Sequence, residues 1–513
     1  MFTGKSTLIP IGLALTIASA QAAVVEPALT LDRPVVAHDS GCTVNLLVRF
    51  DAPEPIDDAG VERPPVQLAL VIDRSGSMQE AGKLVYAKAA AKSLIELLRP
   101  ADRLAIVDYD NRVTVLWPSA PVVAPELTIR AVDGLTPRGG TNLAAGLAAG
   151  LAEIGRDKQT GFTCRTILLS DGLANQGETR ASAIAAMAAE ARRGGVAVTT
   201  MGLGRDYNED LMQTVAAGGG GRYYYIENPA AMQRIFQEEM GKVLRQSTRE
   251  LALWFEHGAA IRGVTVYGYP FETAGNRTTI GMKDLYGGDA ISVLLSLELA
   301  APGTGRFKVG RIGLSYVDAA DGRRHQRDFP VTVTGSADAA LVAASVDVPT
   351  AVEATLIVAD ECHDQAVRAF ESGDKPGALA SLAVVRQDVS AAANEYGDPK
   401  LTKKLEALSL EEADMNRAER DPAYRSGYLK RSKEAFYGSR QGKRDKYLLD
   451  QSAKGLDVEN LQKALADRGH YHGAPDGQFD DEVRAAVAAF QAASGLDPDG
   501  IAGPLTLRAL GLY

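Results

Sequence analysis

The stretch LALVIDRSGSM, residues 68–78, decides the fold of the central part of the chain. Its first five residues form a near-continuous apolar run, which is typical of a strand that is covered on both faces. The polar residues that follow lead into a stretch of helical period. The apolar residues on one face of that helix are Leu84, Ala87, Ala91, Leu94 and Leu98. A buried strand followed by an amphipathic helix predicts a βα unit.

Similar units continue along the chain. Apolar runs recur at residues 104–107, 166–169 and 196–201, with helical stretches between them. Residues 113–116 follow a tight turn at residues 109–112, which predicts an antiparallel hairpin partner for the strand before it. The alternating order predicts a doubly wound, mostly parallel sheet of Rossmann-like type over residues 66–246.

The flanking segments have other patterns. Residues 27–50 and 248–334 show short alternating strands separated by Gly, Pro and Asp, which predicts a β-sandwich-like region with the α/β unit inserted in it. The overall fold class is therefore multidomain, α/β plus β plus α. The predicted segments are a signal peptide (1–23), β strands and a Pro-rich, acidic linker (24–65), the α/β unit (66–246), a β-sandwich-like region (247–336), a helical segment (348–422), a basic polar linker (423–452) and a small C-terminal domain (453–513). The basic stretch has two interpretations, a solvated linker or an electrostatic contact with anionic envelope polymers.

Length and composition narrow the function classes. A chain of 513 residues is too long for one hydrophobic core, and 46% hydrophobic with 23% charged residues is typical of a globular protein. The formal net charge of −10 argues against nucleic acid as a main partner. The cysteines Cys42, Cys164 and Cys362 show no zinc or redox spacing, and leave open one disulfide or three thiols.

The first residues of the chain predict export. Lys5 precedes an apolar run at residues 8–17, and small residues follow it as far as Ala23. This pattern is typical of a signal peptide that is cleaved near Ala22 or Ala23. The alternative, a membrane anchor, is disfavoured because the apolar run is too short to span a bilayer. No later segment of the sequence is long and apolar enough to cross a membrane, so we expect an exported protein of the periplasm or cell wall.

Polar side chains gather where three of the predicted elements end or begin. Asp73, Ser75 and Ser77 follow the first strand, Thr141 opens a helix in the run Gly-Gly-Thr-Asn, and Asp171 follows a buried strand in Ser-Asp-Gly. Alone, the first of these motifs could be a helix N-cap. Because the carboxyl ends of parallel strands meet at one edge of a sheet, however, we expect these oxygens to converge. An oxygen-only donor set suits a hard divalent cation.

These motifs, in this order and spacing over residues 66–244, resemble the von Willebrand factor type A family and its metal-ion-dependent adhesion site. The resemblance implies that Ser75, Ser77 and Thr141 ligate Mg²⁺ or Mn²⁺ through their hydroxyls. It also implies that Asp73 and Asp171 act largely through bound waters and by orienting the hydroxyls. A protein ligand would complete the site with the carboxylate of an acidic residue.

The end of the chain carries a second resemblance. VENLQKAL at residues 458–465, DGQF at 476–479, VAAFQ at 487–491 and DGIAGP at 499–504 are similar to a three-helix peptidoglycan-binding domain. The two Asp-Gly pairs predict turns in which glycine takes a positive φ. The predicted core residues are Leu461, Leu465, Val487, Phe490 and Leu507. The residues that would contact peptidoglycan are not identified by this pattern.

The sequence favours a protein without catalytic activity. None of the six histidines falls within residues 66–246, so a His-based triad is excluded there, and no G-x-S-x-G or H-E-x-x-H motif occurs. We therefore expect an exported adhesion or scaffold protein that binds a protein ligand through a metal and is attached to peptidoglycan. Two alternatives remain: a cell-wall hydrolase or its accessory, with unrecognised chemistry in residues 248–452, and an envelope assembly factor.

Overall fold

The computed structural model describes residues 25–52, 64–159, 161–171, 173–204, 207–226, 247–282, 284–287, 289–318, 322–439, 448–451 and 453–512. The predicted signal peptide, residues 1–23, lies outside this set, as does most of the predicted linker before the α/β unit. Within the described residues, no helix has the length and apolar character needed to span a membrane.

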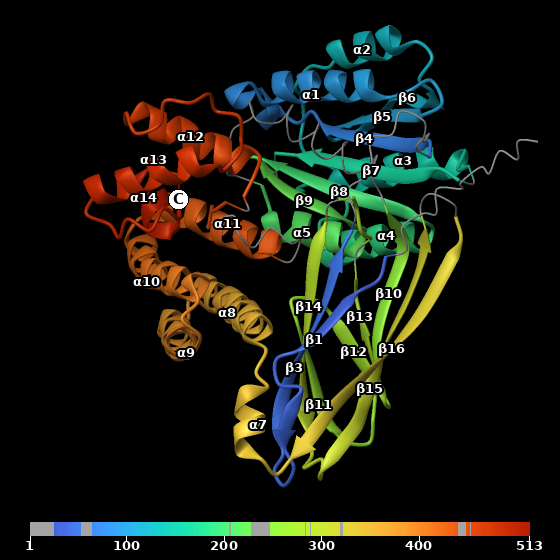
Figure 1. Ribbon diagram of the computed structural model, residues 1–513. Helices are drawn as coiled ribbons and strands as arrows, with labels where there is room; N and C mark the ends of the chain where they lie inside the picture. The colour runs from blue at the N-terminus through green and yellow to red at the C-terminus, as the bar shows by residue number, and fades with distance from the viewer. Residues whose placement is uncertain are drawn as a thin grey trace, which may run out of the picture.

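A six-stranded sheet in the order β6-β5-β4-β7-β8-β9 forms the centre of the α/β unit (Figure 1). Its strands are β4 (Val66–Asp73), β5 (Arg103–Tyr109), β6 (Val113–Pro121), β7 (Thr163–Ser170), β8 (Val196–Leu203) and β9 (Gly220–Ile226). Only β6 runs antiparallel, as the hairpin partner of β5. Every residue of β4 and β7 is buried, as expected for strands covered on both faces. The predicted doubly wound, mostly parallel sheet is confirmed.

Helices cover both faces of this sheet. The helices are α1 (Lys83–Leu97), α2 (Pro125–Asp133), α3 (Leu143–Arg156), α4 (Ala181–Arg193) and α5 (Glu209–Gly218). Leu68 and Leu70 of β4 share one apolar cluster with α1 and α2, whereas Val71 belongs to a cluster with α3, α4 and α5. The apolar face predicted for the first helix is buried. Alternate residues of one strand therefore contribute to two separate cores.

The β-rich part consists of two antiparallel-rich sheets, in the orders β1-β3-β14-β11 and β12-β13-β10-β15-β16-β2. Its strands are β1 (Ala28–Leu31), β2 (Val35–Ala37), β3 (Cys42–Asp51), β10 (Thr248–His257), β11 (Ile261–Tyr267), β12 (Phe271–Ala274), β13 (Arg277–Ile280), β14 (Ala290–Leu299), β15 (Gly305–Asp318) and β16 (Arg324–Ser336). Strand β3 pairs with β14 along its whole length, and β2 pairs with β16. Strands before and after the α/β unit therefore share both sheets.

The loop before β14 connects the β-rich part to the α/β unit through the aromatic ring of Tyr286. The guanidinium carbons of Arg165 and Arg222 lie 5.0 and 5.1 Å from the centre of the Tyr286 ring. Arg222 also makes a two-pronged ion pair with Asp289, at 2.6 and 2.7 Å. Both arginines lie near the amino ends of their strands, β7 and β9. The β-rich part therefore holds the amino edge of the α/β sheet, which leaves the carboxyl edge on the opposite side.

Helices follow the last strand. They are α7 (Ala339–Ala344), α8 (Val348–Glu371), α9 (Lys375–Tyr396), α10 (Pro399–Arg420) and α11 (Pro422–Ser439). Asp347, Asp374 and Asp398 each cap a helix by accepting a backbone N–H, and Pro lies in the first turn after each cap. The sequence predicts a basic linker from residue 423, but the structure has the helix α11 over most of this stretch.

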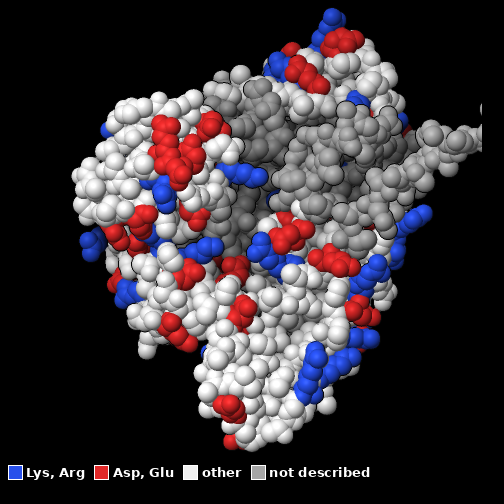
Figure 2. Space-filling view, in the orientation of Figure 1, with Lys and Arg blue, Asp and Glu red and all other residues white. Residues whose placement is uncertain are grey.

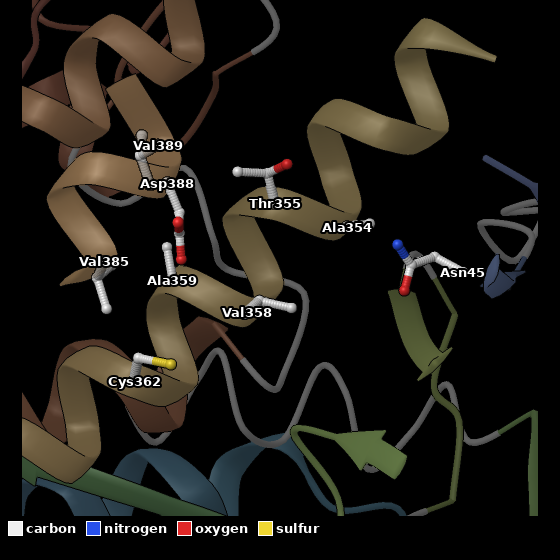
Figure 3. A pocket seen from close by; sticks show the side chains of 9 residues that line it. All are labelled: Asn45, Ala354, Thr355, Val358, Ala359, Cys362, Val385, Asp388 and Val389. Carbon is white, nitrogen blue, oxygen red and sulfur yellow. The ribbon is translucent and has the colours of Figure 1, made fainter. Parts of the chain in front are cut away.

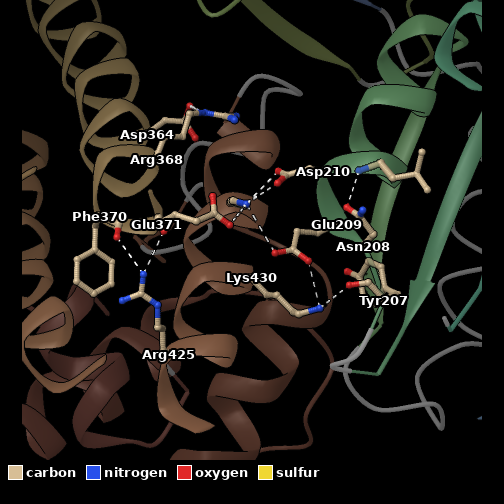
Figure 4. A network of polar contacts seen from close by, with 12 residues as sticks. Tyr207, Asn208, Glu209, Asp210, Asp364, Arg368, Phe370, Glu371, Arg425 and Lys430 are labelled. Atoms are coloured by element: carbon tan, nitrogen blue, oxygen red, sulfur yellow. Dashed lines mark hydrogen bonds and ion pairs between the residues drawn. The ribbon is translucent and has the colours of Figure 1, made fainter. Parts of the chain in front are cut away.

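Two buried lysines of helix α11 have acidic partners on other elements. The side chain of Lys433 is fully buried, and its Nζ lies 2.9 Å from Asp210 and 2.7 Å from Glu371. Lys430 donates to the Tyr207 carbonyl at 2.9 Å and lies 3.3 Å from Glu209 (Figure 4). These partners come from α5, the loop before it and α8, far away in the sequence. The charge pattern of residues 423–446 therefore does not predict these partners.

The C-terminal domain contains α12 (Leu456–Asp467), α13 (Asp481–Ala493) and α14 (Pro504–Ala509) around a common apolar core. Gly477 and Gly500 have φ values of 74° and 73°, as predicted for the two Asp-Gly turns. The domain contacts α10 through Lys403 and Asp499, whose Nζ and Oδ2 are 2.8 Å apart, and through an ion pair between Arg508 and Asp414.

Charged side chains of both signs lie on the face shown in Figure 2. Acidic side chains gather at the upper left, and several basic side chains follow the lower right edge. Two lysines of α11, Lys430 and Lys433, are buried and take no part in the surface charge.

Candidate functional site

The candidate site lies at the carboxyl edge of the α/β sheet. Asp73 is the last residue of β4, and Asp171 follows the last residue of β7. The chain after β4 does not run straight into a helix, as the sequence predicts, but first forms a 3₁₀ segment, Gly76–Gly82, before α1 begins at Lys83. Ser75 makes no side-chain cap bond to this segment. The Ser75 hydroxyl is therefore not used as a cap, and it faces Ser77 and Asp171 instead.

Three oxygens of the site form a small triangle. Ser77 Oγ donates to Asp171 Oδ1 at 2.8 Å, the two serine Oγ atoms lie 3.1 Å apart, and Ser75 Oγ lies 3.5 Å from Asp171 Oδ1. A Mg²⁺ ion with six oxygens at about 2.1 Å has neighbouring ligands about 3 Å apart. The two serine hydroxyls are thus spaced as neighbouring ligands in such a coordination shell, with Asp171 Oδ1 placed to orient them, and this donor set fits a hard divalent cation.

Asp73 is held behind the triangle with both carboxylate oxygens in use. Its Oδ1 accepts the N–H of Ser75 at 2.8 Å, and its Oδ2 accepts the hydroxyl of Ser170 at 2.7 Å. Burial raises the pKa of Asp73 to about 6, although the hydrogen bonds from Ser75 and Ser170 act in the opposite direction. The carboxylate therefore fixes the backbone at Ser75 and the end of β7.

Thr141 lies at the same edge but is attached differently. Its N–H donates to Asn175 Oδ1 at 2.9 Å, and the Thr141 carbonyl accepts the N–H of Asn175 at 3.1 Å. Gly76 N–H donates to the Gly139 carbonyl at 3.1 Å, which ties this loop to the serine loop. Thr141 is buried, and among the described residues its hydroxyl makes no hydrogen bond to the other four predicted residues. The structure thus links Asp73, Ser75, Ser77 and Asp171 by direct hydrogen bonds, whereas Thr141 is linked to them through the backbone of its loop.

Lys83 belongs to the site although the sequence gives no sign of it. Its Nζ donates to Asp171 Oδ2 at 2.8 Å, and its side chain is 7% exposed. Asn175, which holds Thr141, and Ser170, which holds Asp73, were likewise absent from the predicted set. A lysine at the start of an amphipathic helix looks like an ordinary surface residue, because only the fold brings it to Asp171.

The donor atoms of the site are mostly hydroxyls. Over the part of the chain that the structure describes, no group of three or more His, Cys, Asp or Glu side chains is placed to hold a metal ion. Two other carboxylates near this edge have basic partners of their own. Arg74 lies 3.1 Å from Asp108, and Arg138 forms an ion pair with Asp110. Of the carboxylates that the structure describes at this edge, only Asp73 and Asp171 are therefore left to contribute negative charge to the triangle.

A separate pocket of about 190 Å³ lies where α8 and α9 meet β3 (Figure 3). Asn45, Cys362 and Asp388 are among its lining residues. Burial, with the nearby charges of Glu361 and Asp388, raises the pKa of the Cys362 thiol, which disfavours the nucleophilic thiolate. All three cysteines of the chain are free thiols. The lining of this pocket offers no activated nucleophile for the hydrolase alternative.

Comparison with known families identifies two parts of the chain. Residues 67–238 match the family described as "von Willebrand factor type A domain". Residues 454–510 match the family described as "Putative peptidoglycan binding domain". The two matched segments coincide with the α/β unit that carries the oxygen triangle and with the compact domain of α12, α13 and α14.

Two curated relatives each match about half of this chain. The Uncharacterized protein sll0103 of Synechocystis sp. is 26% identical over 283 residues, which cover 53% of this chain and 66% of that protein. The Uncharacterized protein YfbK of Escherichia coli is 30% identical over 251 residues, which cover 47% of this chain and 43% of that protein. The chain thus covers less than two thirds of the length of these curated relatives.

A solved structure shares the fold over a larger part of the chain. The structure "von Willebrand factor type A from Catenulispora acidiphila" superposes with a TM-score of 0.56 at 18% identity, covering 75% of this chain and 90% of that one. At this identity the likeness concerns the fold alone. The chain is therefore a mixed α/β multidomain protein that contains a von Willebrand factor type A domain and a peptidoglycan-binding-like domain.

Proposed function

We propose that this chain is a non-enzymatic envelope protein that binds a protein partner through a divalent cation and is retained on peptidoglycan by its C-terminal domain. The two family matches support an adhesion or scaffold role, and a peptidoglycan-binding domain favours a location at the cell wall or periplasm. The observation that carries the metal assignment is the triangle of Ser75, Ser77 and Asp171 oxygens, with edges of 2.8 to 3.5 Å.

The proposed roles are those that the resemblance to the adhesion site implies. Ser75, Ser77 and Thr141 supply hydroxyl ligands to Mg²⁺ or Mn²⁺, while Asp73 and Asp171 hold bound waters and orient the hydroxyls. When bound, the cation supplies a positive charge that attracts an Asp or Glu carboxylate of the partner. Asp73 is suited to its role because both of its oxygens already fix neighbouring groups.

Calorimetric titration of the full chain with Mn²⁺ and Mg²⁺ tests the metal site. We expect Asp73→Ala to remove metal binding and partner capture together, because the backbone at Ser75 and the end of β7 lose their common acceptor. Asp133→Ala is the matched control, since this exposed carboxylate on α2 pairs with Lys92 away from the site. Isotherms of Asp73→Ala that match the wild type would contradict the assignment.

Sedimentation with isolated sacculi tests the wall attachment. We expect the full chain to sediment, and a chain that ends at Asp450 to stay in solution. Phe490 lies in the C-terminal core and is 5% exposed, so Phe490→Ala should destabilise this small domain by about 3–5 kcal/mol and remove retention. Equal retention of the shortened chain would contradict the attachment.

Incubation with labelled peptidoglycan separates this proposal from the hydrolase alternative. A binding protein leaves the label in the insoluble fraction, whereas a hydrolase releases soluble fragments. We expect no release by the purified full chain, and the Cys362→Ala variant serves as a control for the pocket between α8 and α9. Release of fragments that depends on the protein would overturn the non-enzymatic role.

A further inference from the structure

The contact between Lys83 and Asp171 is a buried ion pair inside the candidate metal site. The exposed fractions of the two side chains are 7% and 0%, and Nζ lies 2.8 Å from Oδ2. The other oxygen of the same carboxylate, Oδ1, accepts from Ser77 at 2.8 Å. Asp171 therefore holds a fixed cation on one oxygen and presents the other to the serine hydroxyls.

Helix stability does not explain the position of Lys83. It is the first residue of α1, where a positive charge is opposed by the helix dipole. The surrounding structure nevertheless leaves space for it. A Cβ on Gly204, whose φ is +75°, would lie 3.1 Å from Lys83 Cε and 3.4 Å from Nζ. The loop after β8 can thus pass closely over the lysine, whose charge finds its partner in Asp171.

The charges of the site balance only when two ligands are present. Among the residues that the structure describes, Asp73 and Asp171 bring two negative charges and Lys83 brings one positive charge, which leaves −1 around the triangle. The nearby Asp108 and Asp110 are each paired with an arginine and add nothing to this sum. A divalent cation turns −1 into +1, and one carboxylate from outside brings the sum to zero.

We propose that Lys83 makes metal binding at this site depend on an acidic residue of the partner. This inference rests on the proposed function and adds to it a residue that weakens the binding of the metal alone. The ammonium lowers the affinity of the site for the cation alone, because two positive charges then share a buried space. A partner carboxylate relieves this excess, so it raises the affinity for the cation, and by linkage the cation raises the affinity for the carboxylate.

The test is Mn²⁺ calorimetry on the full chain, in sodium acetate and in sodium chloride of equal ionic strength. Acetate is the probe for a partner carboxylate. We expect the wild type to bind Mn²⁺ more tightly in acetate than in chloride. Lys83→Gln keeps a hydrogen-bond donor and removes the charge, so it should bind Mn²⁺ about tenfold or more tightly in chloride and depend less on acetate.

Two controls isolate the charge of Lys83. Lys92→Gln removes a lysine from the same helix that pairs with Asp133 at the surface, and it should behave as the wild type. Lys83→Arg keeps the charge and should retain the dependence on acetate. Unchanged or weaker Mn²⁺ binding by folded Lys83→Gln, or a wild type indifferent to acetate, would overturn the inference. A folded wild type that binds no Mn²⁺ in either salt would instead overturn the proposed function.

Discussion

Two buried glutamines, Gln462 and Gln491, hold the turns of the C-terminal domain in the same way. The side-chain amide of Gln491 donates to Asp499, Ile501 and Thr506 at 2.8 to 3.0 Å, and its oxygen accepts the N–H of Gly500 at 2.9 Å. Gln462 makes the corresponding contacts to the other Asp-Gly turn, at residues 476–478. Each glutamine thus satisfies several buried polar groups at once.

Removing such a side chain should destabilise the domain. We expect Gln491→Leu to lower its free energy of unfolding by about 1–3 kcal/mol or more, because the N–H of Gly500 and the Ile501 carbonyl lose their partner in a buried place. Gln451→Leu is the control, since this exposed side chain bonds only to Asp481 among the contacts described. Thermal unfolding followed by far-ultraviolet circular dichroism compares the unfolding midpoints of the two variants with that of the wild type. A midpoint of Gln491→Leu equal to that of the wild type would contradict the role of Gln491.

Sequence identifies the residues of the candidate site whose spacing is local. Asp73, Ser75 and Ser77 stand in one short motif, and Asp171 stands at a strand end, so their convergence follows from the order of the βα units. Lys83 and Asn175 reach the site only through the path of their backbone, the first through a 3₁₀ segment and the second through the loop after β7. Neither the charge pattern nor the hydrophobic periodicity of the sequence predicts the conformation of these two segments.

At the scale of elements, the contact between α3 and the sheet depends on two glycines. A Cβ on Gly150 would lie 2.4 Å from Val71 Cγ2, and a Cβ on Gly146 would lie 2.6 Å from the Tyr109 ring. Helix α3 therefore packs closely on β4 and β5, directly behind the loops that carry Asp73 and Thr141. Any side chain at these positions would push the helix away from the strands.

This packing reverses the usual effect of replacing glycine in a helix. We expect Gly150→Ala to destabilise the protein by about 1–3 kcal/mol, because overpacking exceeds the gain in helix propensity. Gly155→Ala, on the same helix with no atom within 4 Å of the added Cβ, should stabilise it by up to about 1 kcal/mol. Urea unfolding measures both variants. A stabilising Gly150→Ala would show that the helix can shift at no cost.

Prediction of the elements succeeded where apolar periodicity decides and failed where distant charges decide. Strands such as β4 and β7 are apolar throughout because both faces are covered, so the pattern is readable from the sequence. Helix α11 has no strong amphipathic pattern, and its buried face includes Lys430 and Lys433. A buried lysine looks the same in the sequence as a solvated one, and its acidic partners lie more than 60 residues away.

At the scale of the whole molecule, Lys433 ties α11 and α8 to α5. We expect Lys433→Met to lower the free energy of unfolding by about 1–3 kcal/mol, because the carboxylates of Asp210 and Glu371 lose the ammonium that both contact. Hydrogen exchange of the α5 amides should increase as well. Lys375→Met, which removes a pair with Glu419 that does not reach the α/β unit, should leave α5 unchanged. Unchanged hydrogen exchange of the α5 amides in Lys433→Met would contradict the role of Lys433 in holding α5 against α8 and α11.

Docking of the C-terminal domain should depend on pH through Asp499. Burial alone would raise the pKa of Asp499, but the Lys403 ammonium, the Ile501 N–H and the Gln491 amide hold it below its ordinary value of 3.8. A lowered pKa means that the stabilisation is present above the ordinary pKa and is lost as the pH falls through the lowered value.

We therefore expect Lys403→Met to weaken docking by about 1 kcal/mol near neutral pH, and the difference from the wild type to shrink as Asp499 is protonated. Cross-linking between α10 and α14 as a function of pH measures this. A difference that stays constant down to acid pH would contradict the role of the Asp499 carboxylate.

The pairing of β3 with β14 also fixes an order of events during synthesis. Residues 42–51 leave the ribosome long before their partners, residues 290–299, and the whole α/β unit is made in between. At translation rates of about 5–20 residues per second, this interval is roughly 10–50 s. The nascent chain therefore carries β3 without its main neighbour while the α/β unit can already fold. An α/β unit that folds slowly or incorrectly would prolong the exposure of β3. During this interval the unpaired apolar strand of the nascent chain can aggregate.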